Sequence, residues 1–317
     1  MQIIIVILGA VLGLSYGANF EGFIFTQKIC LFAGLTLILP SLFNVKLQDI
    51  TLLWPHKVVV VKSLLLNFIL LPIFAVGIAL LSHDFGVGAG VFLLSVLSGG
   101  GMVMHWIKKS GADTSLGFLL LFMNLTLVTL SLLMLHTYGM YSAAYFGVTY
   151  SDEASVSNFA RGVIMLLIVI PFLVSRVVLL AKPMVKLITS YRSYISNISI
   201  FMILFYLFGL QNSQQLFELY DFEPELIGVS VVAVSAFYML SVGASFLIFN
   251  LDSPQERAAF WHSVTRYITL ALVISTFTTN TFGISMLLPI MMAYLVQIPV
   301  SIVVEKWLER KTVKGES

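Results

Sequence analysis

The stretch Ser95–Asp113 reads SVLSGGGMVMHWIKKSGAD and contains the first residues that could bind a ligand. Gly99, Gly100 and Gly101 come together inside an apolar run. Glycine in a helix interior costs about 1 kcal/mol relative to alanine, so the triplet predicts an interrupted helix. Freed amides favour anions and freed carbonyls favour cations. The alternative is that the glycines only allow close helix packing.

Polar side chains beside this triplet are candidates for the same site. The hydroxyl of Ser98 precedes it, and the imidazole of His105 follows one turn later, where it could bind substrate or take part in proton coupling. His105 could equally be an interfacial side chain next to Trp106. Met104 is a weak candidate for ion coupling.

A second polar group lies in the apolar stretch near the C-terminus. The run Ser275–Gly283 is rich in β-branched and amide residues, which are poor helix formers, so we expect a second interruption there. Its candidate substrate-binding residues are Ser275, Thr276, Thr278, Thr279 and Asn280. Asn124 and Thr126 could offer oxygens to a coupling ion, or could bond only between helices.

Several kinds of chemistry have no residues to support them. No Asp or Glu lies in the core of a predicted span, and Cys30 is the only cysteine. The sequence shows no metal cluster, nucleotide loop or nucleophile triad, so we expect neither an enzyme nor a bound metal or cofactor. Nothing indicates nucleic acid as a partner.

The composition places these residues in a membrane protein. Of the 317 residues, 59% are hydrophobic and 10% are charged, and the mean hydropathy is +1.01. Soluble domains carry roughly 25% charged residues. The expected surroundings are therefore a lipid bilayer.

Apolar runs of roughly 20 residues predict ten transmembrane helices. They centre near Gly9, Leu35, Phe68, Leu97, Leu125, Leu167, Phe201, Val234, Val273 and Ala293. Of the 17 Lys and Arg residues, only Lys28 and Arg161 fall on the side away from the termini. Basic residues favour the cytoplasm, so we expect a multi-pass protein of the cytoplasmic membrane with both termini inside. Arg266 is expected to extend to the cytoplasmic interface.

The long connection 139–158 divides these helices into two sets of five. An odd number of spans per set makes the second set enter from the opposite side. The predicted fold is all-α, a single transmembrane domain (1–317) built from inverted repeats 1–138 and 157–308. The interrupted helices are the fourth and ninth.

Two segments carry a resemblance to a known superfamily. They are VKLQDITLLWPHKVVVVKSLLLNFILLP with SGGGMVMHWIKKSGADTSLGFLLLFMNLT, and RYITLALVISTFTTNTFGISMLLPIMMAYLVQIPVSIVVEKW. Together they resemble the bile acid:sodium symporter and arsenite-efflux permease superfamily, the second segment being similar to arsenite permeases in particular. The resemblance covers most of the chain and implies crossed, broken fourth and ninth helices.

Key residues implied by this resemblance differ here. Arsenite permeases have a cysteine where this chain has Gly99 or Gly100, and an Asn-Asn-Phe-Glu run where it has Val264–Tyr267. Sodium-coupled relatives have a Ser-Asn pair where Met104 and His105 stand, and a ninth-span glutamate that is missing near Ala271. Neither a thiolate metalloid site nor that sodium site carries over.

The leading hypothesis is a secondary active transporter of a small organic solute, for which an anion is one candidate. It would work by alternating access, coupled to H⁺ or Na⁺ through other groups. One alternative is a membrane sensor or binding protein of the same fold that does not transport. Another is a divergent metalloid efflux permease. The substrate, the direction of transport and the oligomeric state stay open.

Overall fold

A computed structural model describes residues 2–19, 43, 54–100, 102–150, 169–191, 194–195, 197–198, 201–202, 205, 209 and 224–315. The regular structure of these residues is helical. The predicted spans near Leu35 and Leu167 lie outside them, as does most of the span near Phe201. The helices are α1 (Gln2–Asn19), α3 (Lys57–Leu65), η2 (Leu66–Leu70), α4 (Leu71–Ser82), α5 (Phe85–Val96), α6 (Val103–Lys109), α7 (Thr114–Thr126), α8 (Val128–Ser142), α10 (Ile170–Leu180), α11 (Lys182–Ser190), α14 (Pro224–Ile248), α15 (Pro254–Val264), α16 (Ile268–Phe282), η4 (Ile284–Met286) and α17 (Leu287–Gly315).

Three described helices are long and apolar enough to cross a membrane: Lys57–Ser82, Glu225–Ile248 and Leu287–Arg310. Helices α7 and α8 form a fourth span if the pair, bent by 48°, is taken as one. Helix α5 is apolar but shorter. The structure therefore has the character of an all-α membrane protein, while the ten-helix inverted repeat stays a prediction.

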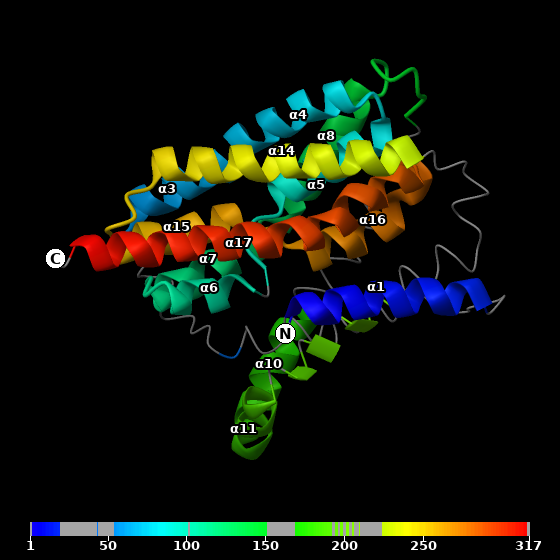
Figure 1. Ribbon diagram of the computed structural model, residues 1–317. Helices are drawn as coiled ribbons and strands as arrows, with labels where there is room; N and C mark the ends of the chain where they lie inside the picture. Colours follow the sequence, from blue (N-terminus) through cyan, green and yellow to red (C-terminus); the bar gives the residue numbers. More distant parts are fainter. Residues whose placement is uncertain are drawn as a thin grey trace. The chain divides into compact units, whose positions relative to one another are not determined.

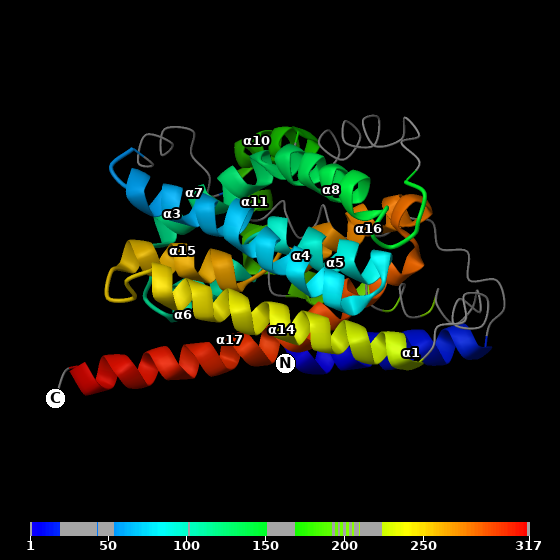
Figure 2. The same cartoon turned by 90° about the horizontal axis from the view of Figure 1, so that it is seen from above.

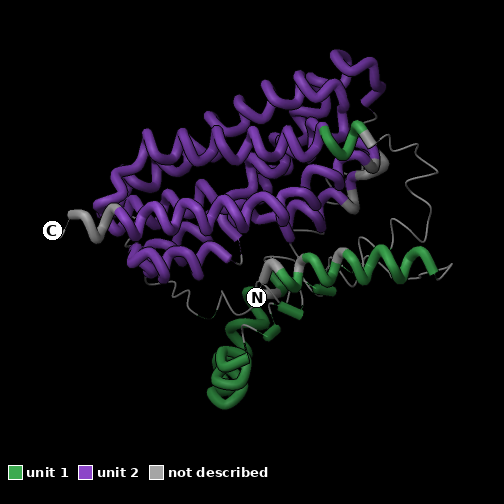
Figure 3. The backbone as a smooth tube through the Cα atoms, viewed as in Figure 1, with its two compact units in different colours: residues 1–44, 161–228 green, residues 45–160, 229–317 purple. Residues whose placement is uncertain are grey.

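The chain divides into two compact units (Figure 3). Unit 1 comprises Met1–Asn44 and Arg161–Gly228, and unit 2 comprises Val45–Ala160 and Val229–Ser317. Each unit draws on both halves of the sequence, so this division differs from the one between the predicted repeats. In unit 1, α1 approaches the backbone at Phe205 closely, because a Cβ added at Gly13 would lie 2.6 Å from the Phe205 oxygen.

Helix α5 forms the centre of unit 2, and every one of its residues is buried. It contacts α4, α8, α16, η4 and α17, and Figures 1 and 2 both place it between α8 and α17. Its first turn is capped by Asp84, whose carboxylate accepts the Val87 amide at 2.7 Å. Gly90 permits the close contact with η4 and the start of α17, because an added Cβ would lie 2.5 Å from both the Met286 oxygen and Cγ of Pro289.

Helices α3 and α4 form one continuous run through the π-helical turn η2. Pro72, in the first turn of α4, has no amide hydrogen to donate to the preceding helical turn. Such a missing bond favours a local π turn, a feature frequent at functional sites. The turn contains Asn67, which is 1% exposed and faces the segment around Arg266.

Candidate functional site

The candidate site is the place where two interrupted helices of unit 2 meet, and we call it the crossing (Leu97–Gly100 and Thr265–Tyr267). Helix α5 ends at Val96, and α6 begins only at Val103. Helix α15 ends at Val264, where Thr265 turns extended with φ −92° and ψ 138°. This confirms the predicted interruption of the fourth span.

The two extended segments satisfy each other's backbone groups. Ser98 and Arg266 form an isolated antiparallel bridge. The Gly99 amide donates to the Thr265 oxygen at 2.9 Å, and the Tyr267 amide donates to the Leu97 oxygen at 2.9 Å. Unpaired amides and carbonyls in an apolar interior cost several kcal/mol each. The pairing therefore explains how both helices can break at the same depth.

The breaks depend on glycine at one position in particular. Gly99 has φ +79°, and a Cβ there would lie 2.6 Å from Nδ1 of His262. Its amide also donates to the His262 oxygen at 3.0 Å. A side chain at residue 99 would thus meet both backbone strain and the imidazole of α15.

His262 is completely buried and joins α15 to α7. Its Nε2 lies 2.9 Å from the Gly117 carbonyl, and its Nδ1 lies 3.4 Å from Nδ2 of Asn124. A carbonyl only accepts and the amide nitrogen only donates, so both contacts fit the neutral tautomer protonated at Nε2. His262 therefore fixes α15 against α7.

Arg266 brings a buried positive charge to the crossing, with a side chain 2% exposed. Its guanidinium donates to Oδ1 of Asn67 at 2.9 Å, to the Ser95 oxygen at 3.2 Å and to Oγ of Ser241 at 3.1 Å. It also donates to the Ser263 oxygen. Within the part of the chain that the structure describes, no carboxylate pairs with it.

Arg266 corrects the sequence-based expectation. The interfacial position predicted for it is wrong, because the helix break turns the side chain inward onto oxygen acceptors rather than toward solvent. Its own amide is held by Oε1 of Gln297 at 2.6 Å. The sequence showed Val264–Tyr267 only as a departure from the arsenite-permease run, and it did not indicate a helix break at Thr265.

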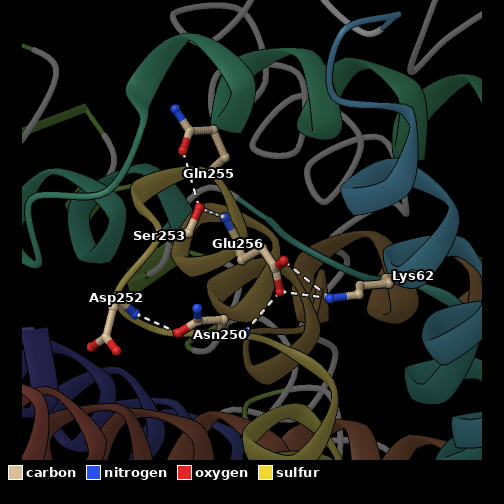
Figure 4. Close-up of polar contacts among 6 residues, drawn as sticks. All are labelled: Lys62, Asn250, Asp252, Ser253, Gln255 and Glu256. Carbon is tan, nitrogen blue, oxygen red and sulfur yellow. Dashed lines mark hydrogen bonds and ion pairs between the residues drawn. The ribbon is translucent and has the colours of Figure 1, made fainter.

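The N-terminus of α15 is held to α3 by a polar cluster (Figure 4). Ser253 caps the helix, and Glu256 in its first turn pairs with Lys62 at 2.9 Å. Glu256 also accepts the Asn250 amide at 2.7 Å, as the dashed lines in Figure 4 show. These contacts fix the start of α15.

The predicted residues of the fourth span are brought only partly to the crossing. Ser98, Gly99 and Gly100 are there, while Gly101 lies outside the described residues. Ser98 is 2% exposed, and its Oγ has no partner among the described residues. His105 is exposed and packs edge-on against Trp106, as its alternative interpretation proposed.

The weak ion-coupling candidates lie on neighbouring helices. Met104 is buried beside Gly117 of α7. Asn124 contacts His262 as described above, which matches the alternative of bonding between helices. Thr126 is exposed and donates to the Met123 oxygen of its own helix at 2.7 Å. Their part in ion coupling stays a prediction.

The predicted break at Ser275–Gly283 is wrong, because α16 runs without interruption from Ile268 to Phe282. Ser275 donates to the Leu272 oxygen at 2.8 Å, and Thr278 donates to the Ile274 oxygen at 3.0 Å. Hydroxyls in an apolar interior bond back to their own helix in this way, so a Ser/Thr-rich run can stay helical. Gly283, with φ +86°, follows the end of the helix.

This helix carries the candidate residues away from the crossing. Ser275 comes eight residues after Tyr267, roughly 12 Å along a helix axis. Thr276, Thr279 and Asn280 also belong to α16, but their side chains lie outside the described part. The role of these residues in substrate binding stays a prediction.

Comparison with known proteins gives the family. Residues 29–216 match the Sodium Bile acid symporter family, which is more than half of the 317 residues. The chain belongs to this family. No curated protein matches the sequence.

Membership in the Sodium Bile acid symporter family confirms the superfamily resemblance noted in the sequence. Together with the apolar helices, it makes the chain a multi-pass membrane protein of a transporter family. The matched residues include the Ser98–Gly100 side of the crossing but end before Arg266. The family match therefore covers only one of the two segments that form the crossing.

Proposed function

We propose that this member of the Sodium Bile acid symporter family is a secondary active transporter that moves a small organic anion across the cytoplasmic membrane. It works by alternating access around the crossing, with both termini in the cytoplasm. The observation that carries the proposal is the backbone bridge between Ser98 and Arg266, which joins the breaks of two helices. Both residues are buried there.

The electrostatics of the crossing favour a negative substrate. Helix α16 begins there at Ile268, and helix N-termini favour anions. Buried polar groups normally have partners, and Ser98 Oγ has none among the described residues. The proposal assigns Ser98 Oγ to the substrate as a hydrogen-bond partner.

The proposal is tested first by ligand binding and then by flux. Purified protein would be screened for thermal stabilisation by small carboxylates and sulfonates, and the best ligands would be tested for uptake into proteoliposomes. We expect saturable uptake that Ser98→Ala weakens through a higher KM. Ser95→Ala is the matched control, because that hydroxyl already donates to the Phe92 oxygen of its own helix at 2.6 Å.

The outcomes separate the competing functions. Uptake that both variants support equally would remove Ser98 from the site. Stabilisation by an anion without any uptake would assign the chain a binding or sensory role instead. Ser275→Ala and Thr278→Val, assayed in parallel, test whether α16 contributes to substrate binding.

A further inference from the structure

The surroundings of the Arg266 guanidinium form a cage of oxygen atoms. Its four acceptors are an amide oxygen from η2, backbone carbonyls from α5 and α15, and a hydroxyl from α14. The ring of Phe237 lies against the guanidinium, 5.5 Å from Cζ to centroid. Neutral oxygens of this kind are the ligands that hard cations prefer.

Two of these oxygens come from the C-terminal ends of half-helices. Ser95 belongs to the last turn of α5, and Ser263 belongs to the last turn of α15. The C-terminus of a helix carries roughly −0.5 elementary charge, so two such ends present about −1 to the cage. One monovalent cation balances that charge, and unwound carbonyls with half-helix C-termini are what hold coupling cations in carriers.

We propose that Arg266 is a built-in cation that permanently occupies a monovalent-cation site at the crossing. The guanidinium supplies the positive charge, so this transporter takes no sodium ion there. Its planar fork reaches acceptors on both sides, from Asn67 to Ser241, which a single ammonium cannot do. The proposal concerns cation binding alone and holds whatever the substrate is.

The test replaces Arg266, the built-in cation, with alanine and then supplies a free cation in solution. Thermal unfolding of the purified full chain would be followed in sodium chloride, guanidinium chloride or choline chloride at matched ionic strength. We expect the wild type to respond equally to sodium and choline. Arg266→Ala should unfold at lower temperature and regain stability with sodium or low-millimolar guanidinium. A ligand at ten times its Kd should raise the Tm by roughly 2 °C.

Two controls isolate the charge and the position. Urea has the shape of guanidinium without its charge and should not restore Arg266→Ala. Arg257 lies on α15 and, like Arg266, donates to two carbonyls, those of Leu251 at 2.8 Å and Ser110 at 2.7 Å. It lies away from the crossing, so Arg257→Ala should gain no sodium or guanidinium response.

The results that overturn the proposal are distinct from a failure of transport. A folded Arg266→Ala protein that responds to neither cation would show a merely structural arginine. A sodium-specific rise in the wild type that Asn67→Ala abolishes would place sodium in the cage beside Arg266. If Arg266→Ala does not fold, the Arg266→Lys variant provides the test. The proposal requires that sodium does not raise the Tm of Arg266→Lys, and a saturable rise of its Tm with sodium would refute the proposal.

Discussion

Replacing Gly99 with alanine should destabilise the protein strongly, because two separate costs fall on one methyl group. The residue has φ +79°, where a non-glycine residue is strained, and the left-handed conformation costs about 1–2 kcal/mol. The new Cβ would also lie 2.6 Å from Nδ1 of His262. Overpacking of this kind costs about 1–3 kcal/mol, so the sum is roughly 2–5 kcal/mol.

The imidazole cannot move away at little cost. His262 is held at Nε2 by the Gly117 carbonyl at 2.9 Å and contacts Asn124 at Nδ1. In thermal unfolding we expect Gly99→Ala to lower the Tm by roughly 3–8 °C. Gly77 is the matched control: it lies in α4 with nothing within 4 Å of an added Cβ. Gly77→Ala should be neutral or stabilising by up to about 1 kcal/mol.

A double-mutant cycle with His262→Ala separates the two costs. Without the imidazole, Gly99→Ala should lose the overpacking and keep only the strain of about 1–2 kcal/mol. If Gly99→Ala costs no more than Gly77→Ala, the conformation assigned to the crossing is refuted. If its cost is the same with and without the imidazole, the contact with His262 is not its cause.

Substitutions at four further residues test the contacts that support the crossing. Asp84→Ala should cost about 1–2 kcal/mol in unfolding assays, because the helix cap of α5 is lost, whereas Asp84→Asn should restore most of it. Oε1 of Gln297 accepts the Arg266 amide at 2.6 Å and the Tyr238 hydroxyl at 2.7 Å. Gln297→Leu leaves both donors without this acceptor and should lower the free energy of unfolding by about 2–5 kcal/mol. Tyr238→Phe removes only one of the two bonds and should lower it clearly less. Lys62→Met should cost up to about 1 kcal/mol, a difference that shrinks with added salt; equal Tm values for variant and wild type at low salt would contradict this.

The interruption of the fourth span could be predicted because its cause is local. Three consecutive glycines weaken a helix wherever they occur, and Gly99 and Gly100 do have positive φ in the structure. The apolar composition and the superfamily resemblance were likewise readable from the sequence. Each of these depends on residue type and order, without reference to what packs nearby.

The ninth span shows where such reasoning fails. A Ser/Thr-rich run predicted a break, yet Ser275 and Thr278 bond to their own helix and the run stays helical. The break lies instead at Thr265, where nothing in the local sequence forbids a helix. It is stabilised by backbone partners from Leu97 and Gly99, which are more than 160 residues away in the chain.

The sequence by itself determined that this chain is a membrane protein, that its fourth span is broken and to which superfamily it is similar, since hydropathy and helix propensity are properties of consecutive residues. Only the tertiary structure decided where the second break lies and what Arg266 does. A charged side chain faces water or the interior according to the acceptors around it, and these come from η2, α5, α14 and α15. Their convergence on one guanidinium exists only in the folded protein.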